Sequence, residues 1–151
     1  MSHIDYFKLQ AKNLFRDYQT QYLDESGRVP IYAYKPSYFD IDRIFVEFDW
    51  NEENLSLMKI QHLFALLIGF ESWADLVNAS EAELELAKLL FDNQHKISVE
   101  DWEMYIAGAE HDINTTFDTE ARIETFEHVF ANVEGHHNPF GDWRLTKQNS
   151  R

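Results

Sequence analysis

Histidines and acids near the end of the chain are the residue types here that could bind a metal ion. Glu124 and His128 are four residues apart, so a helix would place both on one face, and His136 is a third candidate ligand. The chain has no His-Glu-x-x-His motif, no cysteine and no second Glu-x-x-His pair on another predicted helix. We therefore predict no metal, no other cofactor and no catalysis. A metal-dependent enzyme using Glu124, His128 and His136 is an alternative reading.

Other signatures of catalysis are also missing from the sequence. There is no G-x-S-x-G motif and no phosphate-binding loop, and the five glycines are dispersed. His62 lies inside an apolar stretch, where a hydrogen-bonded core histidine is the expected reading rather than a catalytic base. These absences favour a non-enzymatic protein.

Acidic residues dominate the second half of the chain. The net charge is −14, and residues 71–134 contribute −13 of it, from sixteen acids against Lys88, Lys96 and Arg122. Such a field repels nucleic-acid phosphate and anionic lipid, and attracts basic partners. We predict a protein-interaction module, such as an inhibitor, antitoxin or accessory protein, that binds a basic or nucleic-acid-binding protein. The alternative is a solvated surface that only maintains solubility.

The candidate contact residues for such a partner are two tyrosines and five glutamates. Clustered tyrosines can form a rigid amphipathic binding surface, or they can form a lid packed over the core. The candidates are Tyr32, Tyr34, Glu100, Glu103, Glu110, Glu120 and Glu127. The sequence leaves open whether the chain also forms homo-oligomers.

The apolar stretch Ser56–Leu76 is the element around which the rest must be arranged. Apolar residues at steps of three and four predict a helix, and others, including Met58, fill its remaining faces. A helix that is apolar nearly all round is a buried one. Gly69 would end this helix, and Glu71–Ala79 would form a second one in a helix–turn–helix arrangement.

Capping signals predict the C-terminal helices. Ser80 with Glu83 forms a capping box, and Ser98 with Asp101 caps the next helix, in which Gly108 would allow a close approach. A last helix would carry the apolar residues at positions 123–133. The chain is therefore expected to be mostly helical in its second half.

Residues 38–50 are ambiguous between helix and strand. Ile44, Val46, Phe48 and Trp50 alternate as in a strand, whereas a helix started by Asp40 also fits and is favoured. We predict an all-α fold, with one small β-hairpin near residues 30–50 left open. It would be a compact helical bundle with a buried central helix and a helix–turn–helix-like core. Residues 1–134 would form a single helical domain, and residues 135–151 a flexible or loosely docked tail.

Several of these residues resemble a family of small bacterial domains. Ala11-Lys12 in a first helix and the spacing S-x4-Q-x3-A-x3-GF-x2-W-x2-L, from Ser56 to Leu76, are similar to the glyoxalase-related family. The resemblance covers residues 8–79 and implies a helical bundle. The family carries no established activity to transfer. The repeated βαβββ units and paired metal ligands of the catalytic glyoxalase fold are not found here.

The same spacing is similar to a DNA-binding helix–turn–helix. The helix that would enter the groove holds Glu71 and Asp75 and no Lys or Arg, although groove binding depends on cations that contact phosphates. A basic ridge of Lys8, Lys12 and Arg16 on the first helix is the other nucleic-acid candidate. We expect no direct nucleic-acid binding and keep it as a further alternative.

The chain carries no sign of a membrane or secreted protein. No apolar run reaches the roughly 20 residues that cross a bilayer, and the first residues lack the apolar core of a signal peptide. The absence of cysteine suits a reducing compartment. We therefore expect a cytoplasmic protein that does not bind membranes.

Overall fold

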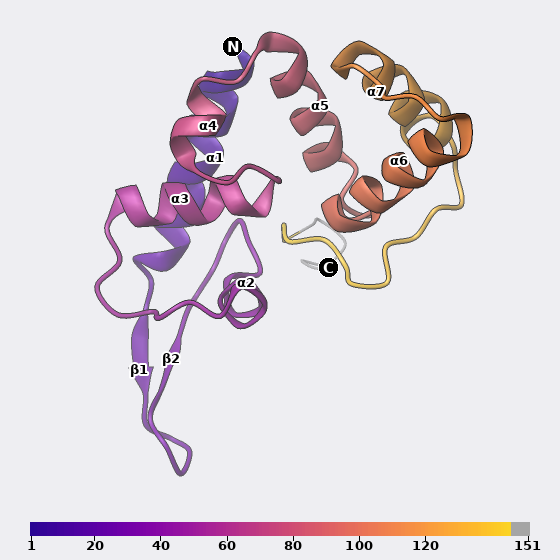
Figure 1. Cartoon of the computed structure of the whole chain (residues 1–151). Coiled ribbons are helices and arrows are strands. Elements are labelled where there is room, and N and C mark those ends of the chain that lie inside the picture. Colours follow the sequence, from indigo (N-terminus) through magenta and orange to yellow (C-terminus); the bar gives the residue numbers. More distant parts are fainter. Residues whose placement is uncertain (146–151) are drawn as a thin grey trace. The chain divides into compact units, whose positions relative to one another are not determined.

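The computed structural model describes residues 1–145, and most of its regular structure is helical (Figure 1). The elements in chain order are α1 (His3–Tyr18), β1 (Tyr22–Asp24), β2 (Ile31–Ala33), α2 (Ile41–Phe48), α3 (Leu57–Leu67), α4 (Trp73–Val77), α5 (Glu81–Asp92), α6 (Val99–Ile113), α7 (Thr119–Phe126) and the π-helical turn η1 (Glu127–Ala131). The described residues thus contain seven α-helices and one small antiparallel hairpin. The prediction of a helical fold of packed helices is confirmed.

The chain divides into two compact units. Of the described residues, the first contains Asp5–Phe64 and residues 143–145, and the second contains Met1–Ile4 and Ala65–Asp142. In the first unit, aromatic rings of α1 and α3 meet in the core, because Phe7 and Phe64 lie with their ring centroids 6.1 Å apart. Phe39 meets the same Phe64 ring edge-on, with centroids 6.4 Å apart. Such tilted and edge-on pairs are the favoured aromatic geometries.

A buried carboxylate fixes the segment between β2 and α2 in the first unit. Asp17 is 1% exposed. Its two oxygens accept hydrogen bonds from the backbone N–H groups of Ser37, Tyr38 and Phe39, at 2.7, 3.0 and 2.7 Å. A buried charge is tolerated when its hydrogen bonds are complete. Asp17 therefore ties the end of α1 to residues 37–39.

The hairpin lies earlier in the chain than residues 30–50. β2 was within the expected range, but its partner is β1, with Tyr22 opposite Ala33 and Asp24 opposite Ile31. Asp24 accepts hydrogen bonds from the backbone N–H and the hydroxyl of Ser26, which supports the turn. Because the backbone of β2 pairs with β1, the hairpin does not need a strand from residues 38–50.

Residues 41–48 form helix α2, so the favoured prediction of a helix in this segment is confirmed. Ile41, Ile44 and Phe45 are buried on one face, whereas Val46 is exposed. The alternating strand reading of this segment is wrong because Val46 and Phe45 follow helical rather than two-residue periodicity. Asp49, with φ of 52°, ends the helix in the left-handed conformation.

The described end of the chain docks onto the first unit. The backbone N–H of Asp40 donates to the Trp143 carbonyl at 2.8 Å, and that of Leu145 donates to the Tyr38 carbonyl at 2.9 Å. The guanidinium of Arg43 lies 4.0 Å from the centroid of the Trp143 ring. Up to residue 145, therefore, this segment makes specific contacts.

The second unit has its own aromatic core. Trp102 of α6 is fully buried, and its ring meets Phe126 of α7 edge-on at 5.1 Å between centroids and Phe130 of η1 at 6.0 Å. Leu90, Ile97 and Ile106 complete this core. The α6–α7 half of the unit is thus held by burial of large apolar side chains.

Side-chain caps start the helices of the second unit, and those of α5 and α6 were predicted. Ser80 and Glu83 form the capping box of α5, with both hydrogen bonds present. The Ser98 hydroxyl accepts from the backbone N–H of Asp101 and so caps α6. The Asp118 carboxylate accepts from the backbone N–H of Ala121 and caps α7.

Three expectations about small or apolar residues need correction or sharpening. Met58 is 76% exposed, so the first turn of α3 is not buried on every side. Gly108 faces open space, with nothing within 4 Å of the position a Cβ would take, so it permits no close approach. Gly69 does: its Cβ position would lie 3.0 Å from Cγ1 of Val99, and its φ is +97°. The close contact behind Gly69 is therefore with the start of α6 rather than with α4.

No helix in the part of the chain that the structure describes is long and apolar enough to cross a membrane.

Candidate functional site

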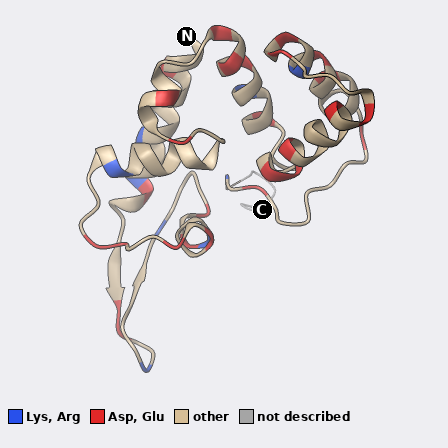
Figure 2. Cartoon of the chain, in the orientation of Figure 1, with Lys and Arg blue, Asp and Glu red and all other residues tan. Residues whose placement is uncertain are grey.

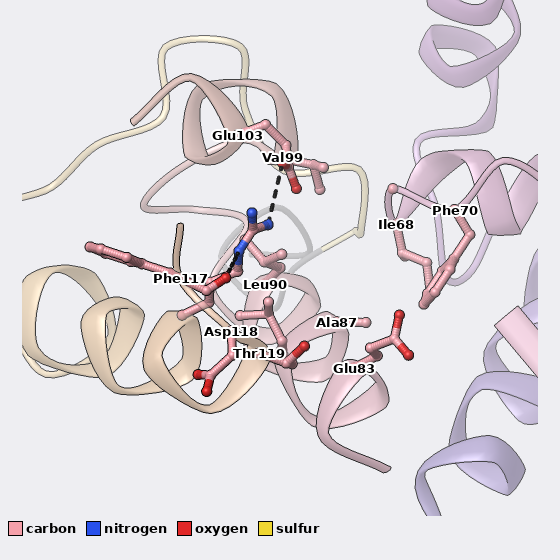
Figure 3. A pocket seen from close by; sticks show the side chains of 13 residues that line it. Ile68, Phe70, Glu83, Ala87, Leu90, Val99, Glu103, Phe117, Asp118 and Thr119 are labelled. Atoms are coloured by element: carbon pink, nitrogen blue, oxygen red, sulfur yellow. Dashed lines mark hydrogen bonds and ion pairs between the residues drawn. The ribbon is translucent and has the colours of Figure 1, made fainter. Parts of the chain in front are cut away.

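The second unit contains a pocket of about 360 Å³ (Figure 3). It is formed by the residues that follow α3, the inner face of α5, the start of α6 and the start of α7. The pocket lies entirely among residues 68–122, so one folded unit supplies all of it. Its volume is near the lower end of the roughly 300–1,000 Å³ typical of ligand pockets.

Apolar side chains form the wall of this pocket. Three of them are buried: Ile68, Ala87 and Leu90. Four others are only half-buried: Phe70, Leu86, Val99 and Phe117. The wall therefore still offers apolar surface that a further apolar group could cover.

One cation, Arg122, lies in the pocket and is already engaged. Its Nη2 lies 3.4 Å from Oε2 of Glu110, its Nη1 lies 4.0 Å from Oε2 of Glu103, and its Nε donates to the carbonyl of Phe117 at 3.3 Å. The same Glu110 carboxylate accepts from the backbone N–H of Phe117 at 2.7 Å. Arg122 thus organises the loop between α6 and α7.

The rim of the pocket is acidic. Glu83, Glu103 and Asp118 are exposed carboxylates among its lining residues, against the single cation Arg122. The backbone N–H of Ser80 donates to Glu83, and this hydrogen bond lowers the pKa of that carboxyl below its usual value. Asp118 caps α7, and Glu83 is the acidic member of the capping box of α5, so both carboxylates are positioned by the first turn of a helix.

The seven predicted contact residues are divided between the two units, with the tyrosines in the first and the glutamates in the second. Tyr34 is only 7% exposed, and its hydroxyl donates to Oε1 of Glu52 at 2.6 Å, so its ring packs inside the first unit. Tyr32 is half-buried on β2, and its hydroxyl donates to Glu53 at 3.1 Å. Burial and hydrogen bonding raise the pKa of both tyrosines above the usual value. The burial of Tyr34 therefore fits the alternative in which the tyrosines form a lid packed over the core.

The predicted glutamates divide into exposed and engaged groups. Glu100, Glu120 and Glu127 are exposed. Glu103 is exposed and lies on the pocket rim. Glu110, with a side chain only 19% exposed, is committed to Arg122 and Phe117 inside the unit. Glu110 therefore links Arg122 and the backbone of Phe117 within the unit.

The three candidate metal ligands do not converge. No group of three or more His, Cys, Asp or Glu side chains that could hold a metal ion occurs among residues 1–145. Glu124 and His128 are both exposed on α7 and η1. The ring Nε2 of His136 instead lies 2.8 Å from the carbonyl oxygen of Val129. His136 also packs on Phe130, with ring centroids 4.8 Å apart.

The two nucleic-acid candidates lie in different units, the basic ridge in the first and α4 in the second. Lys8, Lys12 and Arg16 are all exposed on α1, and Arg16 donates to Asn13 at 2.7 Å. α4, which would be the recognition helix, has only five residues and carries Asp75 without a Lys or Arg. The charge pattern that argued against groove binding is thus present on the folded helix.

Sequence reasoning missed the pocket because its parts come from four separate segments. The sequence identifies Glu83 only as part of a capping box, and Arg122 only as one of three bases in an acidic region. Two starting turns, those of α5 and α7, contribute to one pocket because α5 packs against α7. A lone arginine among many acids was the available signal.

Comparison of the chain with family models, with curated proteins and with solved structures gave no match. The resemblance of residues 8–79 to the glyoxalase-related family therefore stays a prediction.

Proposed function

We propose that the acidic helical unit is a non-enzymatic interaction module that binds a basic protein partner in the cytoplasm. An inhibitor, an antitoxin or an accessory protein of a nucleic-acid-binding protein would all use such a surface. The observation that carries the proposal is that each of the few cations of residues 71–134 has partners within the unit, while thirteen of the sixteen acids there are exposed.

Each of the three cations has internal partners. Lys88 Nζ lies 2.6 Å from Oδ2 of Asp92. Lys96 Nζ donates to the carbonyls of Phe130, Ala131 and Val133, so it satisfies the end of η1. Arg122 is held by Glu110 and Glu103 as described above. No lysine or arginine of this region remains to neutralise the other acids.

The acids, by contrast, face solvent. All of the sixteen acids of residues 71–134 except Asp92, Asp101 and Glu110 are exposed. Figure 2 shows acidic residues along α5, α6 and α7, with few basic ones beside them. The field of this unit is therefore negative over much of its surface, which raises the rate of encounter with a cationic partner.

Like charges are also repeated along single helix faces. Glu120 and Glu124 are four residues apart on α7, and Glu127 is three residues further on. Like-charge neighbours at this spacing destabilise a helix by roughly 0.2–0.5 kcal/mol per pair. A cationic partner would remove this repulsion. The repulsion among these glutamates would therefore be smaller in a complex with a cationic partner than in the isolated chain.

The test compares two triple variants with equal loss of charge. Glu120→Gln, Glu124→Gln and Glu127→Gln remove acids of the acidic unit, and Glu25→Gln, Asp42→Asn and Glu47→Gln remove exposed acids of the other unit. Binding of a fluorescently labelled lysine-rich peptide is measured by anisotropy at low and high salt. We expect the first variant to weaken binding roughly tenfold, since exposed ion pairs contribute up to about 1 kcal/mol each. The second should have little effect.

Three results would contradict the proposal. Equal loss in both variants would mean that only net charge matters and that the acids merely solvate the protein. Absence of salt-sensitive peptide binding would remove the electrostatic basis of the proposal. A salt-dependent mobility shift with bare duplex DNA, lost on Lys8→Gln with Lys12→Gln, would favour nucleic-acid binding instead.

A further inference from the structure

The pocket among α5, α6 and α7 is lined in part by apolar side chains that remain accessible to solvent. Phe70, Leu86, Val99 and Phe117 line it and are only partly buried. Interface energy concentrates where a large side chain fills such a pocket and excludes water. A volume of about 360 Å³ suits a side chain or a short segment rather than a large cofactor.

The charges around the pocket select the kind of partner. Three exposed carboxylates, those of Glu83, Glu103 and Asp118, line the pocket against one guanidinium. The guanidinium of Arg122 is already bound by Glu110, Glu103 and the carbonyl of Phe117. An anionic ligand would have to displace these contacts and approach the carboxylates. A cationic partner would meet carboxylates whose contacts, in two of the three cases, are hydrogen bonds to backbone N–H groups.

We infer that this pocket takes an apolar anchor side chain of the basic partner, flanked by lysines or arginines that face Glu83, Glu103 and Asp118. The inference rests on the proposed function and specifies where on the acidic unit the partner binds. The apolar anchor supplies the buried contact, and the flanking cations supply complementarity with the rim.

The test uses three synthetic peptides and the full chain. One peptide carries a single leucine flanked by lysines, the second replaces this leucine with serine, and the third keeps the leucine but replaces the lysines with serines. Binding is measured by anisotropy. Methyl chemical shifts of Leu86, Ala87 and Val99 report on the pocket. We expect the leucine–lysine peptide to bind about ten times more tightly than either of the other two, because its anchor is buried.

Variants of the wall show whether the anchor uses this pocket. Leu86→Gln should lower the affinity of the leucine–lysine peptide to that of the serine–lysine peptide and leave the latter unchanged. Val99→Thr is a second variant of nearly equal volume that tests the same wall if Leu86→Gln does not fold. Val46→Thr, on an exposed face of α2, is the matched control and should change neither affinity.

The outcomes separate this inference from the proposed function. Equal, salt-sensitive binding of both lysine peptides, weakened by the triple change of Glu120, Glu124 and Glu127, would overturn the pocket inference and leave the proposed function standing. If no lysine peptide binds, the proposed function fails and the inference falls with it. Equal binding of the two leucine peptides would overturn the role of the acidic rim.

Discussion

The Glu110 carboxylate lies 3.4 Å from the guanidinium of Arg122 and also accepts the backbone N–H of Phe117 at 2.7 Å. One side chain near the end of α6 therefore fixes both the loop that follows it and the only cation among the described residues that line the pocket. This arrangement makes Glu110 a support for the pocket rather than part of its binding surface.

Replacing Glu110 should destabilise the second unit. Glu110→Ala removes the acceptor for Phe117 and the closest carboxylate to Arg122, so we expect a loss of about 1–2 kcal/mol in the free energy of unfolding. Urea denaturation measures it. Glu103→Ala is the matched control, since Glu103 is 58% exposed and 4.0 Å from the same guanidinium, and it should cost roughly 0.5 kcal/mol or less. Equal costs would show that the Glu110 contacts carry no special stability.

The buried carboxylate of Asp17 should be among the most sensitive positions of the first unit. Asp17→Ala leaves the backbone N–H groups of Ser37, Tyr38 and Phe39 without their acceptor. We expect a loss of roughly 3 kcal/mol in the free energy of unfolding. Glu47→Ala, an exposed acid of α2, should change it by about 0.5 kcal/mol at most. A small effect of Asp17→Ala would mean that water replaces the carboxylate.

Two glycines should respond in opposite directions to the same substitution. Gly69 has a φ of +97° and a Cβ there would lie 3.0 Å from Val99, so Gly69→Ala should destabilise by about 1–2 kcal/mol. Gly108 lies within α6 in open space, so Gly108→Ala should stabilise by about 0.5–1 kcal/mol. Thermal unfolding of both variants tests this. A stabilising Gly69→Ala would mean that the turn after α3 relaxes freely.

Tyr34 should make the first unit sensitive to alkaline pH. Burial, followed by the hydrogen bond to Glu52, raises the pKa of the Tyr34 phenol above its ordinary value of about 10. Below that value both states hold the proton and stability is fully present. As the pH rises above it, the unfolded chain loses the proton first, so stability falls.

The measurement is the free energy of unfolding at about pH 8 and about pH 11 for the protein and for Tyr34→Phe. The variant loses the hydrogen bonds to Glu52 and Gln21 at every pH, so it should be less stable at the lower pH. Its further loss on going to the higher pH should be smaller than that of the unaltered protein. Parallel losses would show that Tyr34 does not contribute to alkaline sensitivity.

The helices could be predicted because their signals are local. Ser80 with Glu83, and Ser98 with Asp101, start α5 and α6 where the sequence placed them, since a cap and its partner are three residues apart. The position of the hairpin was less predictable. The strand at Ile31–Ala33 could pair with a segment on either side, and only the folded chain shows that it pairs with Tyr22–Asp24.

The candidate site was less predictable than the fold. The acidic character of residues 71–134 follows from composition, and so does the scarcity of cations there. That Tyr34 is buried and that Glu110 turns inward depends on contacts with residues distant in the sequence, such as Glu52 and Arg122. A pattern of exposed and buried side chains along one helix cannot reveal these partners.

The sequence by itself determined the helical elements, their caps and the negative charge of the C-terminal helices, because these depend on residues close together in the chain or on composition alone. Only the tertiary structure decided that the starts of α5, α6 and α7 and the residues after α3 enclose one pocket. That pocket depends on which helix faces pack together, which is set by the shapes of distant side chains such as Trp102 and Phe126.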